Sequence, residues 1–162
     1  MKLDISMTVN GRVLEGRVEP RVSLADFLRR DGGMTGVRVG CEEGACGACT
    51  VSLDGATARS CLTLAVSADG SEVLTVEGLA NGLELHPLQR ALHEHHGTQC
   101  GFCTSGVLMT MRELLQEIPH PTEEEVRERL GANLCRCTGY QFIVDAVLAA
   151  AEELAGSGSE IE

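Results

Sequence analysis

The sequence is poor in aromatic side chains and in positive charge. It has no tryptophan, one tyrosine and three phenylalanines in 162 residues, so we expect a core built from Leu, Val, Ala, Ile and Met. Thirteen Lys and Arg stand against 24 Asp and Glu, which gives a formal net charge of −11. Because phosphate groups are bound by clustered basic residues, we expect neither nucleic acid nor an anionic membrane surface as a partner.

Long apolar runs are also missing. A membrane-spanning helix needs about 18 or more consecutive apolar residues, and no such run occurs, so the sequence predicts no membrane span. Residues 1–9 lack a basic region, an apolar segment and a small-residue cleavage site, so we expect no secretory signal and a cytoplasmic protein. The sequence has no P-loop, dinucleotide fingerprint or Ser–His–Asp pattern, so we expect no independent catalysis from this chain.

Cysteine, in contrast, is abundant. Disulfides, structural zinc sites and scattered buried thiols are the simplest explanations for the eight cysteines. Their tight grouping argues against scatter, and both a reducing cytosol and the short spacings argue against disulfides. Two sets of four thiolates are what two iron–sulfur or zinc centres require. The groups are Cys41, Cys46, Cys49 and Cys61, then Cys100 and Cys103, then Cys135 and Cys137.

The first half of the chain is predicted to be rich in strands. Asn10-Gly11 and Asp54-Gly55 are strong hairpin signals, and polar and apolar residues alternate before the first of them. Ser23, with Asp26 in the first turn, resembles a capping box at the start of a short helix. The predicted strands cover residues 3–9, 12–18, 50–53, 56–60 and 73–76, and the predicted helix covers residues 24–30.

The second half is predicted to be helical. Pro87 stands at a helix start, Pro119 ends a long apolar stripe, and Thr122 with Glu125 forms a further capping box. Apolar residues at helical spacing predict four helices, which begin at Pro87, include residues 107–118, cover 123–130 and include 143–154. We therefore expect an α+β chain with an N-terminal domain over residues 1–78, a linker over 79–85, a helical domain over 86–155 and a disordered tail over 156–162.

The first cysteine group has the spacing of a plant-type [2Fe–2S] ligand loop. Cys41-x4-Cys46-x2-Cys49 is followed by Cys61, beyond the second predicted hairpin. Three ligands on one loop must curl around a small cluster, and the glycines of this loop allow the positive φ angles and close backbone approach that this requires. A zinc site would need the same thiolates but not the glycine-rich loop. The pattern favours an iron–sulfur cluster, with zinc as the alternative.

The second cysteine group combines Cys100-x2-Cys103 with Cys135-x-Cys137. The first pair opens the long predicted helix, and the second pair lies in a turn just before the last helix. Helix N-termini carry unpaired N–H groups and the positive end of the dipole, so they favour an anionic centre between them. An oxidised [2Fe–2S] cluster with four thiolates carries a charge of about −2. On its own this spacing also suits zinc.

Three motifs together resemble a known family. Residues 40–51 (GCEEGACGACTV), 99–106 (QCGFCTSG) and 133–140 (NLCRCTGY) resemble the ligand motifs of the iron–sulfur small subunit of molybdenum hydroxylases, the xanthine oxidase family. Its bacterial members include carbon monoxide, quinoline, nicotine, nicotinate and isoquinoline dehydrogenases. The resemblance spans residues 3–154. It implies an N-terminal plant-ferredoxin-like β-grasp domain followed by a C-terminal four-helix bundle, each with one [2Fe–2S] cluster.

The resemblance also implies partners and a role. It implies a large subunit that binds molybdopterin in its cytosine dinucleotide form, a medium FAD-binding subunit and a dimer of heterotrimers. Substrate would be oxidised at molybdenum, and single electrons would pass through the helical-domain cluster and then the ferredoxin-domain cluster to FAD. Gln99 and Cys137 would lie near the pterin. The ligands of the first cluster would be Cys41, Cys46, Cys49 and Cys61, and those of the second Cys100, Cys103, Cys135 and Cys137.

Two alternative functions stay open at this point. A free-standing two-cluster ferredoxin would use the same cysteines, although a diffusing carrier has no need of the second domain. A zinc-stabilised interaction module would use them too, but it would be colourless. We also expect the apolar side chains of Phe102, Met109, Met111 and Phe142 to form surface that a partner covers.

Overall fold

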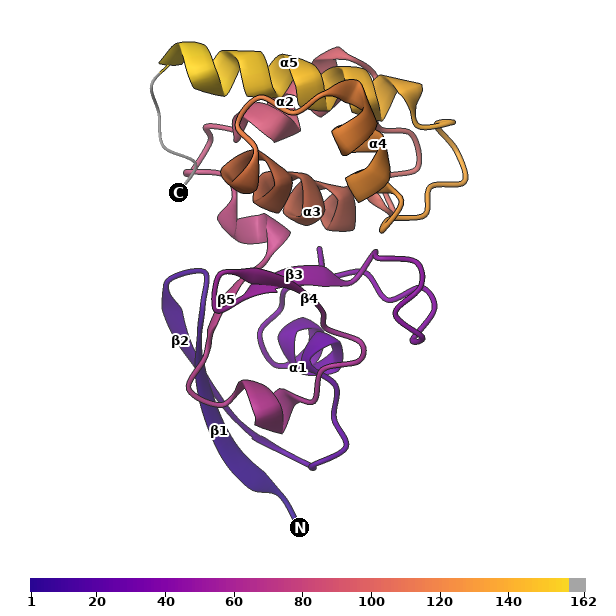
Figure 1. Cartoon of the computed structure of the whole chain (residues 1–162). Coiled ribbons are helices and arrows are strands. Elements are labelled where there is room, and N and C mark those ends of the chain that lie inside the picture. The colour runs from indigo at the N-terminus through magenta and orange to yellow at the C-terminus, as the bar shows by residue number, and fades with distance from the viewer. Residues whose placement is uncertain (158–162) are drawn as a thin grey trace.

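The computed structural model describes residues 1–157, which form a sheet-containing N-terminal half and a helical C-terminal half (Figure 1). The strands are β1 (Leu3–Val9), β2 (Arg12–Val18), β3 (Thr50–Leu53), β4 (Ala56–Arg59) and β5 (Glu72–Leu74). They form one sheet in the order β2-β1-β5-β3-β4. β1 and β2 are antiparallel, β5 runs parallel to β1, and β3 is antiparallel to both β5 and β4, so β4 is an edge strand.

Both predicted hairpins are confirmed. Asn10 and Gly11 join β1 to β2 with φ angles of 50° and 75°, and Asp54 and Gly55 join β3 to β4 with φ angles of 50° and 89°. Positive φ at both central residues is the geometry of the two-residue turns that match the right-handed twist of hairpins. β1, β2 and β3 have the predicted bounds, whereas β4 ends one residue early, at Arg59.

The last strand differs from its prediction. The sequence predicts a strand over residues 73–76, but β5 ends at Leu74 and a 3-10 turn, η2 (Val76–Gly78), follows it. The N–H of Thr75 donates to the side-chain oxygen of Asn10 at 2.9 Å, and the Thr75 hydroxyl donates to the Glu77 carboxylate. Thr75 is thereby bound to the first hairpin turn instead of extending the sheet.

Helix α1 (Leu24–Arg30) covers the apolar face of the sheet. Ser23 caps it by accepting a hydrogen bond from the Asp26 N–H at 3.1 Å, as the capping pattern predicts. A 3-10 turn, η1 (Ala65–Ala68), packs on the same helix. The core between them is mostly aliphatic, with one fully buried aromatic ring, and it includes Ile5, Met7, Val9, Leu24, Phe27, Leu28, Val51 and Val73.

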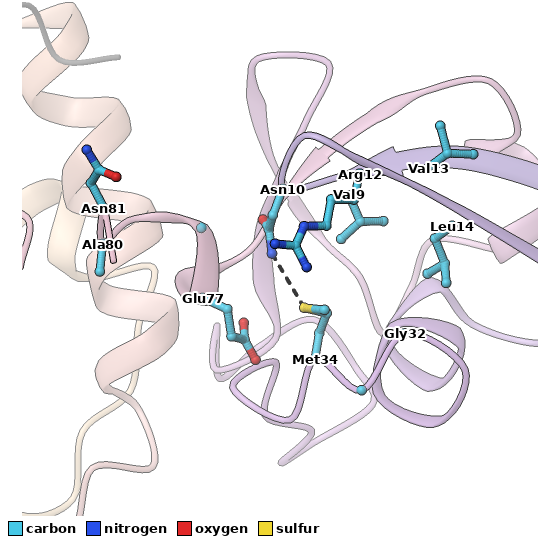
Figure 2. A pocket seen from close by; sticks show the side chains of 12 residues that line it. Val9, Asn10, Arg12, Val13, Leu14, Gly32, Met34, Glu77, Ala80 and Asn81 are labelled. Carbon is cyan, nitrogen blue, oxygen red and sulfur yellow. Dashed lines mark hydrogen bonds between the residues drawn. The ribbon is translucent and has the colours of Figure 1, made fainter. Parts of the chain in front are cut away.

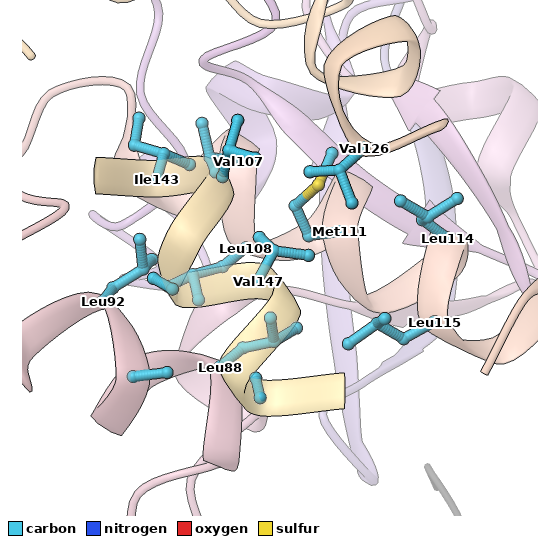
Figure 3. Packing of buried hydrophobic residues seen from close by; sticks show 14 of the residues in the cluster. Leu88, Leu92, Val107, Leu108, Met111, Leu114, Leu115, Val126, Ile143 and Val147 are labelled. Carbon is cyan, nitrogen blue, oxygen red and sulfur yellow. The ribbon is translucent and has the colours of Figure 1, made fainter. Parts of the chain in front are cut away.

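Four α-helices make up the described part of the C-terminal half: α2 (Pro87–Glu94), α3 (Thr104–Glu117), α4 (Glu123–Leu130) and α5 (Gln141–Ser157). α2 and α4 each pack against both α3 and α5. Aliphatic side chains from all four helices fill the space between them (Figure 3), including Leu88, Met111, Leu115, Val126 and Val147.

Helix ends lie where local signals predict them. Thr122 and Glu125 form the expected capping box of α4, in which the Glu125 N–H donates to the Thr122 hydroxyl at 3.3 Å. α3 stops at Glu117 because the next residue, Ile118, precedes a proline and takes an extended conformation. His86 caps α2, since its Nδ1 accepts a hydrogen bond from the Leu88 N–H at 3.2 Å.

Two methionines expected at the surface are buried, so that expectation is wrong. Met109 and Met111 of α3 are 1% and 0% exposed. The other helices pack on one side of α3, and β3 and β4 pack on another, so α3 is covered within this chain on more than one face. Phe102 and Phe142 do remain exposed, by 45% and 49%.

The last helix extends into the segment for which the sequence predicts a disordered tail. α5 runs through Ser157, so Gly156 and Ser157 are helical, and residues 158–162 of the expected tail lie outside the described residues. Throughout residues 1–157, every helix is too short or too polar to cross a membrane.

The two halves meet backbone to backbone. α3 lies across β3 and β4 (Figure 1). A Cβ atom at Gly106 of α3 would lie 2.1 Å from the carbonyl oxygen of Gly47. A Cβ atom at Gly47, whose φ is +73°, would lie 2.3 Å from the carbonyl oxygen of Ala132. Because both positions lack a side chain, the loop before β3 can approach α3 and the loop after α4 closely.

Gly106→Ala should lower the free energy of unfolding by about 1–3 kcal/mol, because the new methyl group meets fixed backbone rather than a movable side chain. Chemical denaturation followed by circular dichroism measures this. Gly156→Ala in α5 is the matched control, because nothing lies within 4 Å of its Cβ position. A Gly106→Ala protein as stable as the control would contradict the close contact.

Candidate metal centres

The first cysteine group lies at one end of the sheet. The loop between α1 and β3 carries three of its thiols and the segment after β4 carries the fourth, and these are Cys41, Cys46, Cys49 and Cys61. Gly44 and Gly47 in the loop have φ angles of 77° and 73°. The chain therefore curls back between the cysteines, as its glycine pattern predicts.

The thiols of this group meet in two pairs. The Cys41 and Cys46 side chains interact with each other, and the Cys49 and Cys61 side chains do the same. The backbone N–H groups of Glu43 and Cys46 each donate to Cys41 Sγ at 3.4 Å. These donors point at a sulfur that a cluster would use as a thiolate, which is the form they stabilise.

The second cysteine group forms where two helices begin. Cys103 is the N-cap residue of α3, while Cys135 and Cys137 shortly precede α5. Here too the thiols interact in pairs, Cys100 with Cys137 and Cys103 with Cys135. Cys103 is buried, whereas Cys100 and Cys137 are exposed. The second group therefore has a buried edge and a solvent-facing edge.

Two polar side chains that no sequence pattern singled out, Thr138 and Tyr140, hold the turn around Cys135. The Tyr140 hydroxyl accepts a hydrogen bond from the Cys135 N–H at 2.8 Å, and the Thr138 hydroxyl lies 3.1 Å from Cys135 Sγ. The Thr138 hydroxyl also accepts from the Tyr140 N–H at 3.2 Å. Residues in such positions orient metal ligands. Their only signal in the sequence is that they follow the Cys-x-Cys pair directly.

The pairwise arrangement of the thiols bears on the kind of centre. A single tetrahedral zinc ion needs all four ligands around one point. In a [2Fe–2S] cluster, each of two irons takes two protein ligands. The thiols of each group interact most closely two by two, and the pairs also interact with each other, as Cys61 does with Cys41. This donor set fits a two-iron cluster.

Gly40 packs closely against the first ligand loop and the Phe102 ring. A Cβ atom at Gly40 would lie 3.3 Å from Cys46 Sγ and 3.2 Å from the ring of Phe102. Both contacts are tighter than almost all real Cβ contacts, so a side chain at this position would press on the ligand loop. The same ring shows that a residue of the second ligand motif lies against the first loop.

The thiols differ strongly in acidity. The backbone N–H groups of Cys46 and Glu43 lower the pKa of Cys41 to about 7. Burial raises the pKa of Cys103 to about 12, and burial together with the Cys49 side chain raises the pKa of Cys61 to about 11. The Cys61 and Cys103 thiols therefore stay protonated at neutral pH until a metal replaces the proton.

The two cysteine groups are neighbours in the fold. The N–H of Leu134 donates to the carbonyl oxygen of Cys46 at 2.9 Å, which links a residue of the first group to the residue before Cys135. The side-chain amide of Asn133 donates to the carbonyl oxygen of Gly47 at 3.0 Å. The sequence predicts that the groups belong to separate domains, and it does not predict this contact.

The remaining candidate residues lie at the surface. Gln99 is exposed next to Cys100, at the solvent-facing edge of the second group. Three large apolar side chains from the same segments are also exposed, namely Phe102, Leu134 and Phe142. His93, His95 and His96 are exposed as well.

A cavity of about 730 Å³ lies on the N-terminal half, and it contains no cysteine (Figure 2). The β1–β2 hairpin, the segment after α1 and the residues around η2 line it. The Asn10 side-chain amide donates to Met34 Sδ at 3.4 Å, and Glu77 accepts from the Gly36 N–H at 2.7 Å. These polar groups already have partners within the chain, and the cavity is separate from the metal centres.

Comparison with protein families gives one match for each half. Residues 7–80 match the family described as "2Fe-2S iron-sulfur cluster binding domain". Residues 75–148 match the family described as "[2Fe-2S] binding domain". Each match contains one of the two cysteine groups in full.

Comparison with individual proteins gives similar chains of similar length. The nicotine 6-hydroxylase small subunit of Paenarthrobacter nicotinovorans is 56% identical over 147 residues, which cover 91% of this chain and 88% of that protein. Caffeine dehydrogenase subunit gamma of Pseudomonas sp. strain CBB1 is 53% identical, with coverage of 88% and 87%. A chain of quinoline 2-oxidoreductase from Pseudomonas putida 86 superposes with a TM-score of 0.93 at 52% identity and covers 98% of this chain and 99% of that chain.

The chain belongs to the family of iron–sulfur small subunits of molybdenum hydroxylases. Its relatives carry the names of oxidoreductase subunits, and both of its halves match [2Fe–2S]-binding families. The N-terminal half therefore has the ferredoxin-like fold that its five-stranded sheet and α1 indicate.

In the chain without clusters, Cys41 should react first with iodoacetamide and Cys103 last. The thiolate is the nucleophile, so the Cys41 rate should rise with pH to about 7 and then level off. The Cys103 rate should still be rising far above that pH, because its pKa is about 12. Mass spectrometry of peptides after timed alkylation at several pH values measures both. Equal rates for the two thiols at neutral pH would contradict the prediction.

Proposed function

We propose that this chain relays single electrons between a molybdopterin-binding subunit and FAD in a molybdenum-containing dehydrogenase. The observation that carries the proposal is the direct contact between two four-cysteine sites in one chain, through the hydrogen bond from Leu134 to Cys46. A chain that holds two redox sites side by side has the arrangement that stepwise electron transfer needs. When bound, the two [2Fe–2S] clusters would supply one-electron chemistry.

The residues that would hold the two clusters follow from the thiol pairs. The Cys41–Cys46 and Cys49–Cys61 pairs would each bind one iron of the first cluster, and the Cys100–Cys137 and Cys103–Cys135 pairs would do so for the second. The N–H groups that donate to Cys41 Sγ would stabilise its thiolate. Thr138, beside Cys135, would do the same in the second site.

The second site is proposed to receive electrons from the molybdopterin. Its solvent-facing edge carries Cys100, Cys137 and Gln99, and exposed apolar side chains at Phe102 and Phe142 come from the adjoining segments. Aromatic residues at an exposed patch are typical of interface anchors. The large subunit would cover this edge. Gln99, an amide that both donates and accepts hydrogen bonds, would face the pterin together with Cys137.

The chain itself supplies a short route from the second site to the first. Cys135 is bonded to Leu134, whose N–H donates to the Cys46 carbonyl oxygen at 2.9 Å. Electrons would then leave the first site toward FAD. The names of the relatives, a small subunit and a subunit gamma, support a hetero-oligomer.

The finer organisation is part of the same proposal. The domains would be residues 1–78 and 86–155 with a linker over 79–85, and α2 to α5 would form a four-helix bundle. The complex would be a dimer of heterotrimers with FAD on a medium subunit and molybdopterin, as the cytosine dinucleotide, on the large one. The mutual packing of α2, α3, α4 and α5 supports the bundle.

The purified protein should contain two irons and two acid-labile sulfides for each cluster, hence about four of each per chain. Cys46→Ser should remove one electron paramagnetic resonance (EPR) signal and Cys100→Ser the other, because the two ligands belong to different sites. Metal analysis and EPR spectra of the reduced protein measure this. Zinc at both sites, or the loss of both signals in each single variant, would overturn the proposal.

Gln99→Ala should leave both clusters assembled but weaken retention of the molybdenum cofactor or slow electron entry from substrate. The reason is that Gln99 would touch the pterin rather than a cluster ligand. Cofactor content and the rate of cluster bleaching by substrate measure the effect in the assembled complex. His95→Ala, another exposed position nearby in the chain, is the control. Full cofactor occupancy with unchanged bleaching in Gln99→Ala would exclude this role.

A further inference from the structure

One face of the edge strand β4 points at the helical half. Thr57 and Arg59 lie two residues apart, so they share a face of the strand. The Thr57 N–H and hydroxyl donate to the Glu113 carboxylate of α3 at 2.5 and 2.7 Å. Arg59 reaches across to the loop after α4. Both contacts join the two halves, but only the second involves the cysteine loops.

The Arg59 guanidinium spans both cysteine-bearing segments. Its Nε donates to the carbonyl oxygen of Gly44 at 3.3 Å, which lies between Cys41 and Cys46. Its Nη2 donates to the carbonyl oxygen of Ala132 at 2.7 Å, on the segment that leads to Cys135. Its Nη1 donates to the Thr50 hydroxyl at 2.5 Å, next to Cys49. Three nitrogens of the planar guanidinium thus bind three acceptors around the contact between the two cysteine groups.

The acceptors of this cation are all neutral. Within the part of the chain that the structure describes, Arg59 forms no ion pair with a carboxylate. Nearby Glu113 is instead paired with Arg129 at 3.1 Å. The positive charge of Arg59 therefore lies, without a counter-charge from an acid, between two sites that would each hold a cluster of charge about −2.

We propose that Arg59 is a positioning residue that fixes the separation of the two iron–sulfur sites and, through its charge, raises the reduction potentials of both. This inference rests on the proposed function. The fork is essential to it because lysine has the same charge but a single nitrogen, which cannot hold the three acceptors at once. The charge is essential because reduction adds a negative charge to each cluster, and a nearby cation stabilises that charge.

The test compares Arg59→Lys and Arg59→Met in the complex assembled with its partner subunits. Arg17→Lys is the matched control, since Arg17 is exposed on β2, away from the cysteine groups, and pairs with Asp4 at the surface. Three quantities are measured: the magnetic splitting between the two reduced clusters by EPR, the two midpoint potentials, and amide hydrogen exchange in residues 132–136. The magnetic splitting falls steeply as the distance between the two clusters grows, so it reports their separation. Residues 132–136 contain the Leu134 N–H, so their exchange rate reports its hydrogen bond to Cys46.

Each variant has its own expected result. Arg59→Lys should keep about four irons per chain and near-normal potentials, but lose the wild-type splitting and exchange residues 132–136 about tenfold faster. Arg59→Met should show the same two changes and, in addition, lower potentials for both clusters. The Arg17→Lys control should match the wild type in all three measurements.

Different experimental results would overturn the proposed function and the role of Arg59. A wild-type protein without two iron–sulfur clusters would overturn the proposed function. A wild-type protein with both clusters, together with unchanged splitting and exchange in Arg59→Lys, would overturn the role of Arg59 alone. Loss of either cluster in both variants would also overturn it, because a residue that positions two assembled sites is not required to assemble them.

Discussion

The hydrogen bond between the Leu134 N–H and the Cys46 carbonyl oxygen joins two loops that are far apart in the chain. Each loop must hold thiols close together, so neither can be braced by regular secondary structure along its length. Contact between the loops supplies donors from the second loop for the carbonyl oxygens of Cys46 and Gly47. Such contact requires close approach, and for that reason Gly47 and Gly106 have no room for a side chain.

The charges around the two cysteine groups also suit their close contact. The chain has a net charge of −11, yet a cation, Arg59, bonds to both cysteine-bearing segments. The nearby carboxylate of Glu113 is bound by Thr57 and Arg129. In the first site, backbone N–H groups point at Cys41 Sγ and favour its thiolate. The junction is thereby prepared for anionic groups although the protein as a whole is acidic.

Local signals predicted the local structure well. The hairpins depend on two adjacent residues with positive φ, and the helix caps depend on a side chain within one turn, so both can be read along the chain. Predictions that depended on distant segments were less accurate. β5 is shorter than expected because Thr75 is bound by Asn10, which lies in another hairpin. Met109 is buried because α3 is covered by both the sheet and the helices.

The sequence by itself determined how many thiols there are, which of them share a loop, and the family to which the three motifs point. Spacing along the chain is a covalent property, and Cys41, Cys46 and Cys49 must stay near one another whatever the rest does. Only the tertiary structure decided that Cys49 meets Cys61, that Cys103 meets Cys135, and that the two groups adjoin. The Cys49–Cys61 contact closes across the β3–β4 hairpin and the Cys103–Cys135 contact lies within the helical half, whereas the contact between the two groups forms only when the helical half packs onto the sheet.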